Sequence, residues 1–133
     1  MSLEIEPRDR EGITVLELKG RITMGDEVSS FRQKIRDLAK TPDSKVILNM
    51  QHVDYIDSTG LGAIVMGSSA VRGAGGTIKL VYLNRRNVEL LVSTKLATIF
   101  EIFNDEQDAV NSFFPGREIK VFDILEFVKT QKD

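Results

Sequence analysis

Four short aliphatic runs stand out in the hydrophobic pattern of this chain. They are ITVLEL (13–18), VILNM (46–50), IKLVYL (78–83) and IFEIF (99–103). We predict a strand at each, and the first two are typical of strands buried on both faces of a sheet. A further edge strand is predicted at 2–7, because Leu3 and Ile5 alternate with polar residues and Pro7 ends the run.

Between these runs, apolar residues recur at helical spacing. Val28, Phe31, Ile35 and Leu38 predict a helix that Asp26 caps. Thr41–Pro42–Asp43 is predicted to end that helix, and a second helix is predicted from Ser58 to the glycines at 73, 75 and 76. A third helix is predicted over 84–93, with Val88 and Leu91 facing inward. A fourth is predicted from Asn104 or Asp105 to Pro115–Gly116. RITMGDE (21–27) and the stretch 51–57 are expected to be loops.

The resulting order, β-β-α-β-α-β-α-β-α, predicts an α/β fold. We expect a single domain over 1–114, with a mixed, mostly parallel sheet of about five strands and about four helices. Residues 115–133 form a C-terminal extension. Its apolar positions are Ile119, Phe122, Leu125 and Phe127 or Val128. They favour a further helix packed on the domain, or a contact with another chain, including a dimer partner.

Composition adds mainly exclusions. The chain has 133 residues and a formal net charge of -2, so nothing attracts it strongly to nucleic acid or to an anionic membrane. It contains no Cys, which excludes disulfides and cysteine chemistry. The charged N-terminus lacks a signal-peptide pattern, and no apolar run is long enough to span a bilayer. We expect a cytoplasmic protein without membrane insertion.

The stretch DYIDSTGLG (54–62) joins a predicted strand to a predicted helix. In open α/β sheets, functional groups gather at such joints. Ser58 has the side chain favoured at a helix N-cap, with Asp57 beside it. Gly60 and Gly62 fall in the first turn, where glycine costs helix stability, so they indicate backbone kept open for close approach by another molecule.

A catalytic role for this stretch would require motifs and partner residues that the sequence lacks. The sequence does not match the nucleophile elbow G-x-S-x-G, and the only His, His52, lacks the remaining members of a triad. There is no P-loop, and the Gly-rich RGAGG (72–76) fits a helix end better than a phosphate cradle. No metal-binding motif is present. We therefore expect no enzyme, no catalytic residue, no metal site and no cofactor.

Modification fits the residues better. A hydroxyl at a helix N-terminus is a favourable place for a phosphate, because free N–H groups and the helix dipole stabilise its charge. The added charge at Ser58, next to Asp57, would disfavour a partner that packs on this apolar and glycine-rich surface. The sequence thus predicts a binding surface switched by phosphorylation.

VILNMQHVDYIDSTGLGAIV (46–65) resembles the signature of the STAS domain (sulfate transporter and anti-sigma factor antagonist), an apolar strand followed by a loop ending in D-S-[ST]-G-L-x-x-[LIV]. GRITMGDE (20–27) and KLATIFEIFNDEQDAV (95–110) are similar to two further segments of that family. The resemblance runs over about residues 3–114 in the family's order. It implies a STAS-like fold.

The resemblance also implies a function. Anti-sigma factor antagonists of this family bind, when unmodified, an anti-sigma factor that is a Ser/Thr kinase, and so free its sigma factor. The kinase then phosphorylates the motif serine, which separates the complex, and a Ser/Thr phosphatase resets it. By motif position that serine is Ser58. The supporting and interface positions are Asp26, Tyr55, Ile56, Asp57, Thr59, Gly60, Leu61 and Gly62.

Two features depart from the family pattern. Asn49 stands where the family's strand commonly carries Asp, and the segment 117–133 extends past the usual domain end. A STAS scaffold or regulatory subunit of a transporter or signalling complex, without phosphoryl transfer, is the alternative. The intact D-S-x-G at 57–60 favours the phosphorylated antagonist over that alternative.

Overall fold

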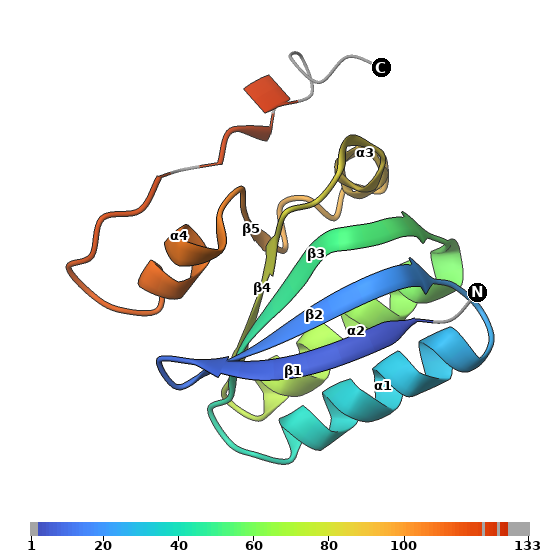
Figure 1. Ribbon diagram of the computed structural model, residues 1–133, viewed down its shortest axis with the longest axis horizontal. Coiled ribbons are helices and arrows are strands. Elements are labelled where there is room, and N and C mark those ends of the chain that lie inside the picture. The colour runs from blue at the N-terminus through green and yellow to red at the C-terminus, as the bar shows by residue number, and fades with distance from the viewer. Residues whose placement is uncertain (1–2, 121, 125, 128–133) are drawn as a thin grey trace.

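A computed structural model describes residues 3–120, 122–124 and 126–127 of the chain. Its elements follow the predicted order (Figure 1). They are β1 (Glu4–Arg10), β2 (Ile13–Ile22), α1 (Asp26–Ala39), β3 (Lys45–Ile56), α2 (Ser58–Gly73), β4 (Thr77–Val81), α3 (Arg85–Ser93), β5 (Glu101–Phe103) and α4 (Glu106–Asn111).

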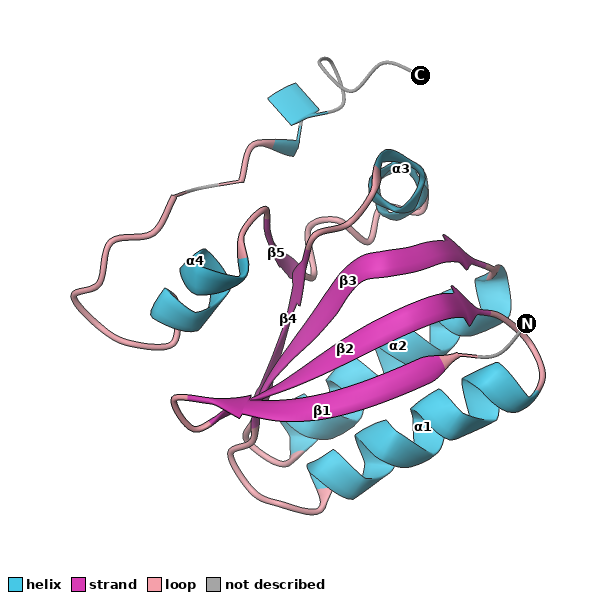
Figure 2. Cartoon of the chain, in the orientation of Figure 1, coloured by secondary structure: helices cyan, strands magenta, loops and turns pink. Residues whose placement is uncertain are grey.

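The sheet has five strands in the order β1-β2-β3-β4-β5. β1 is antiparallel to β2, and every other neighbouring pair is parallel. The prediction of a mixed, mostly parallel sheet with four helices is therefore confirmed. Helices α1 and α2 lie together on one face of the sheet, while α4 lies on the other side (Figure 2).

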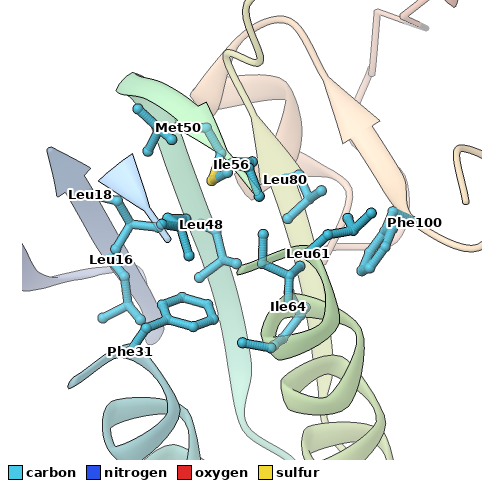
Figure 3. Packing of buried hydrophobic residues seen from close by; sticks show 14 of the residues in the cluster. Leu16, Leu18, Phe31, Leu48, Met50, Ile56, Leu61, Ile64, Leu80 and Phe100 are labelled. Atoms are coloured by element: carbon cyan, nitrogen blue, oxygen red, sulfur yellow. The ribbon is translucent and has the colours of Figure 1, made fainter. Parts of the chain in front are cut away.

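Both faces of the central strands are buried. On the α1–α2 face, Leu48 of β3 packs in the main core with Phe31 of α1 and with Leu61 and Ile64 of α2 (Figure 3). A smaller core on the other face joins residues of β2, β3 and β4 to α4: Ile13, Val15, Ile47, Val81, Ala109 and Val110. Burial on two sides explains why these strands read as continuous apolar runs.

Several predicted strand ends are wrong, among them the end of β2, which continues to Ile22 in the predicted loop at 21–27. Pro7 does not end β1 but lies within it, paired with Leu16, because an edge strand tolerates a residue that cannot donate on its outer side. The predicted loop at 51–57 is strand as far as Ile56, paired with the end of β2 beyond two irregularities in register. Its polar residues lie on a part of β3 with exposed positions, which is why they resemble a loop.

The C-terminal extension packs partly on its own domain. Arg117 donates to Glu11 at 2.9 Å, and Ile124 and Phe127 pack against the main core. The described part of the predicted helix is one turn, closed by the Phe127 N–H on the Asp123 carbonyl at 3.0 Å. Ile119 is 40% exposed. Leu125 and Val128, two positions of the predicted stripe, lie outside the described residues.

No helix in the described part of the chain has both the length and the apolar character that a bilayer crossing requires.

Candidate functional site

The joint at 54–62 lies where β2 and β3 end side by side. Ile22 and Ile56 are the last paired residues of the two parallel strands. The next residue, Asp57, donates its backbone N–H to the Ile22 carbonyl at 3.3 Å, and α2 starts at Ser58. The start of α2 is therefore fixed to the carboxyl end of β2 as well as to its own strand.

Asp57, rather than Ser58, caps α2. One carboxylate oxygen of Asp57 accepts the Gly60 N–H at 2.7 Å, and the other accepts the Met24 N–H at 2.9 Å. These backbone donors, Met24 first and Gly60 next, lower the pKa of Asp57 below its ordinary value. The prediction that Ser58 is the N-cap is wrong, because the carboxylate one residue earlier already occupies the first-turn donor and also holds the β2–α1 loop.

Ser58 is left as the exposed first residue of α2. Its hydroxyl makes no hydrogen bond with any described residue, so it is free for chemistry. The position combines accessibility with the positive end of a helix dipole, which favours an added anion. Thr59, the second hydroxyl, is only partly exposed.

The two glycines of the first turn serve different purposes. Gly60 is buried, and a Cβ built on it would lie 1.9 Å from the Ile22 carbonyl oxygen. The interpretation that Gly60 keeps the helix open to another molecule is therefore wrong: the chain's own β2 needs the space. A Cβ at Gly62 would meet no atom within 4 Å. Gly62 is partly exposed, so nothing in the described fold requires a glycine there.

Asp26 is also placed differently from its prediction. The N-cap of α1 is Gly25, at φ 119°, and no side chain caps the helix. Such a positive φ favours glycine, so the cap position falls one residue before Asp26. Asp26 is exposed and, with Glu27, forms an acidic first turn of α1. These acids interact favourably with the helix dipole.

The remaining predicted interface residues divide between surface and core. Tyr55 is 41% exposed, and the Arg86 guanidinium lies 5.9 Å from the centre of its ring. Ile56 and Leu61 are buried in the main core and also contribute to the lining of a groove beside Ser58. This groove of about 420 Å³ runs between the start of α2 and α3. Tyr55, Ser58 and Arg86 line it together with Leu90 and Thr94.

A second polar cluster, which the sequence reading missed, lies at α4. The Glu106 carboxylate is buried and accepts from Arg8 at 2.7 Å, from Asn49 at 3.1 Å and from Arg10. Burial alone would raise the pKa of Glu106, but hydrogen bonds from Arg8, Asn49 and Arg10 outweigh it and lower that pKa to about 2. We call these four residues the Glu106 cluster.

Asn49 was the available signal for this cluster. It is a polar residue inside an otherwise apolar strand, and such residues need a buried partner. An Asp at this position would set a second carboxylate against Glu106, whereas the amide donates to it. The departure at Asn49 therefore has a local physical reason.

The described residues give no support to an acid–base or metal centre near Ser58. His52 is an exposed residue of β3. Within the described ranges, no group of three or more His, Asp or Glu side chains is placed to hold a metal ion.

Known proteins resemble this chain over most of its length. The family model of the STAS domain matches residues 4–109. The anti-sigma-B factor antagonist of Bacillus subtilis is 30% identical over 77% of this chain and 92% of its own length. The anti-sigma F factor antagonist of Paenibacillus polymyxa is 23% identical over 83% of this chain and 94% of its own length.

A solved structure shares the fold. The crystal structure of a protein from Thermotoga maritima, described as a candidate anti-sigma factor antagonist, has a TM-score of 0.76 at 22% identity. It covers 81% of this chain and 92% of the Thermotoga chain. STAS anti-sigma factor antagonists are non-enzymatic regulatory proteins. The family match, the relatives and the arrangement at 54–62 lead to one conclusion: this chain belongs to the STAS domain family.

Proposed function

We propose that this chain is an anti-sigma factor antagonist controlled by phosphorylation of Ser58. In its unmodified form it binds an anti-sigma factor with Ser/Thr kinase activity in the cytoplasm, and the sigma factor is freed. The observation that carries the proposal is the exposed Ser58 hydroxyl, which has no hydrogen bond to the described residues. Ser58 is the first residue of α2 and follows Asp57, whose carboxylate accepts two backbone N–H groups. The names of the curated relatives support the same role.

The chain is the acceptor in this chemistry. The γ-phosphoryl group of ATP passes to the Ser58 oxygen as its bond to ADP breaks, ADP leaves, and the hydroxyl proton passes to a base of the kinase. The phosphoserine then carries about -1.5 to -2 charges at neutral pH. The adjoining Asp57, whose pKa backbone donors hold below its ordinary value, is ionised at this pH as well. A partner that packs against a neutral hydroxyl thus meets a concentrated negative charge, and the complex separates. A Ser/Thr phosphatase restores the binding form.

Intact-mass measurement tests the phosphorylation. Each anti-sigma factor kinase of the source genome is purified and incubated with this chain and Mg·ATP. We expect one of them to add a single phosphoryl group to the wild type and to Thr59→Ala, but none to Ser58→Ala. Absence of any mass gain with every kinase would reject the switch.

Titration calorimetry tests the release. Ser58→Asp places a carboxylate at the start of α2 and should bind the same kinase at least about tenfold more weakly than the wild type, through like-charge repulsion. Ser58→Ala, which adds no charge, is the matched control and should bind nearly as the wild type does. Equal affinities for Ser58→Asp and Ser58→Ala would contradict release by charge.

A further inference from the structure

A second hollow lies between α1 and α2, away from the groove at Ser58. Its volume is about 270 Å³. It is lined by Arg32, Ile35, Arg36, Ala63, Met66, Gly67 and Ala70. We call it the α1–α2 groove.

Small residues form the floor of this groove. A Cβ on Gly67 would lie 2.7 Å from the Ile35 side chain, so glycine lets α1 and α2 approach closely here. Ala63 and Ala70 extend the small-residue surface by one turn on either side of Gly67. The result is an apolar depression between two helices that is accessible from outside.

The rim of the groove carries side chains that lack partners. Met66 is 68% exposed, and an exposed methionine adapts well to an apolar contact. Arg32 and Arg36 lie one turn apart on α1, and both are exposed. Neither arginine forms an ion pair with any residue in the described part of the chain. An apolar floor with an exposed methionine and two available guanidinium groups has the composition of a protein-binding surface.

The groove and the proposed phosphorylation site lie along the same helix, α2. Ser58, Gly62 and Met66 follow one another at intervals of four on α2 and so share one side of the helix. Eight residues of helix span about 12 Å. A standard interface covers about 800 Å² on each partner, which corresponds to a radius of roughly 16 Å. A protein centred on Ser58 therefore reaches Met66.

Charge differs between the two ends of this surface. The end near Ser58 is mixed, with the acids Asp57 and Asp26 and the cation Arg86, whereas the groove end carries Arg32 and Arg36. A partner that covers both ends therefore needs carboxylates at the groove end.

We propose that the α1–α2 groove is the second half of the docking surface for the protein that modifies Ser58. Its occupant is a segment of that partner with an apolar side chain on the Ala63–Gly67 floor and carboxylates facing Arg32 and Arg36. This inference rests on the proposed function, because it requires a partner that docks at Ser58.

The test compares two charge reversals of equal size. Arg32→Glu/Arg36→Glu changes the groove. Lys45→Glu/Lys120→Glu makes the same change in net charge away from it: Lys45 lies over Phe114, beside the smaller core. Both double variants and the wild type are titrated calorimetrically with the kinase that phosphorylates Ser58, at low and high salt. Melting curves verify that all three are folded.

We expect the groove variant to bind at least about tenfold more weakly at low salt, since it opposes carboxylates to carboxylates, and the control variant to bind within about twofold of the wild type. Met66→Ala should weaken binding without changing its salt dependence. Equal binding by both double variants would overturn the groove while leaving the Ser58 switch intact. A wild type that binds no anti-sigma factor would reject the proposed function and the groove with it.

Light scattering tests the other occupant. If the wild type is a dimer and Arg32→Glu/Arg36→Glu is a monomer, a second copy of this chain covers the groove, and the partner assignment is overturned. A monomer in both variants, together with the weaker binding above, supports the partner segment.

Discussion

The Ser58 site and the Glu106 cluster are both polar, yet they are built in opposite ways. At Ser58 the neighbouring carboxylate of Asp57 accepts two backbone N–H groups, while the Ser58 hydroxyl makes no hydrogen bond with the described residues. In the Glu106 cluster a buried carboxylate is held by two arginines and an amide. The first site presents a hydroxyl to solvent, whereas the polar groups of the second site bind one another.

The difference separates a site for chemistry from a structural site. A buried carboxylate with several donors has a strongly lowered pKa, but it offers nothing to a ligand. The Ser58 side chain carries no charge, and its importance follows from its exposure and its position at the start of α2. The geometry at Ser58 depends on close packing of Gly60 on β2, whereas the Glu106 cluster depends on charge. Substitutions and pH should therefore affect the two sites differently.

The largest effect is expected from Gly60→Ala. Its methyl group would overlap the Ile22 carbonyl oxygen, 1.9 Å away, and push the start of α2 from β2. We expect the free energy of unfolding to fall by about 3 kcal/mol. Gly62→Ala is the matched control: it meets open space and should raise that free energy by about 0.5–1 kcal/mol through helix propensity. Urea unfolding measures both. Similar destabilisation by the two substitutions would show that packing on β2 does not set the site.

A smaller, pH-dependent effect is expected from Glu106→Gln. The folded pKa of Glu106 is about 2 and its ordinary value 4.5, so its ionisation stabilises the fold above pH 4.5 and the benefit is lost as pH falls towards 2. Because Arg8 and Arg10 are each about a third exposed, we expect a contribution of about 2 kcal/mol rather than the full shift.

The measurement is the free energy of unfolding of wild type and Glu106→Gln between pH 2 and pH 7. The wild type should lose its advantage over the variant as the pH falls through this range. Glu6→Gln, at an exposed position of β1, should follow the wild type at every pH. A constant difference between wild type and Glu106→Gln would contradict the charge-based account of the cluster.

Much of the fold follows from local sequence pattern. Runs such as 13–18 and 46–50 are buried on both faces, and so their apolar character is continuous and easily recognised. The end of β3 was not predicted because Gln51, His52 and Tyr55 are exposed there and this part of the strand pairs with β2 alone, so its polar residues resemble a loop. No local sequence pattern distinguishes such an exposed strand end from a loop.

The sequence pattern could identify the stretch 54–62 as the candidate site, but it could not assign the structural role of each residue within it. Turns and helix caps favour all three residue types found at Asp57, Ser58 and Gly60. Their roles are decided by Ile22 and Met24, more than thirty residues earlier in the chain, through the Met24 N–H and the Ile22 carbonyl. The Glu106 cluster likewise joins residues 57 to 98 positions apart, so no short motif reveals it.

The smallest effect, and the one closest to function, concerns Asp57. Asp57→Ala removes both backbone bonds and should lower the free energy of unfolding by about 1 kcal/mol. Asp57→Asn keeps an acceptor for the helix cap but removes the charge, so its stability should lie between those of wild type and Asp57→Ala. Since the pKa of Asp57 is lowered, the wild-type advantage over Asp57→Asn should be present above pH 3.8 and be lost below it. Thermal unfolding at two pH values measures this.

Asp57→Asn also tests whether the carboxylate contributes to release. If the phosphate and Asp57 repel a partner together, phosphorylation of Ser58 should weaken binding less in Asp57→Asn than in the wild type. Calorimetry of the phosphorylated and unmodified forms of both proteins gives the two ratios. A smaller ratio for Asp57→Asn would assign the carboxylate an electrostatic part in the switch. Identical ratios would restrict Asp57 to holding the β2–α1 loop and the start of α2, and would leave the phosphate alone to separate the complex.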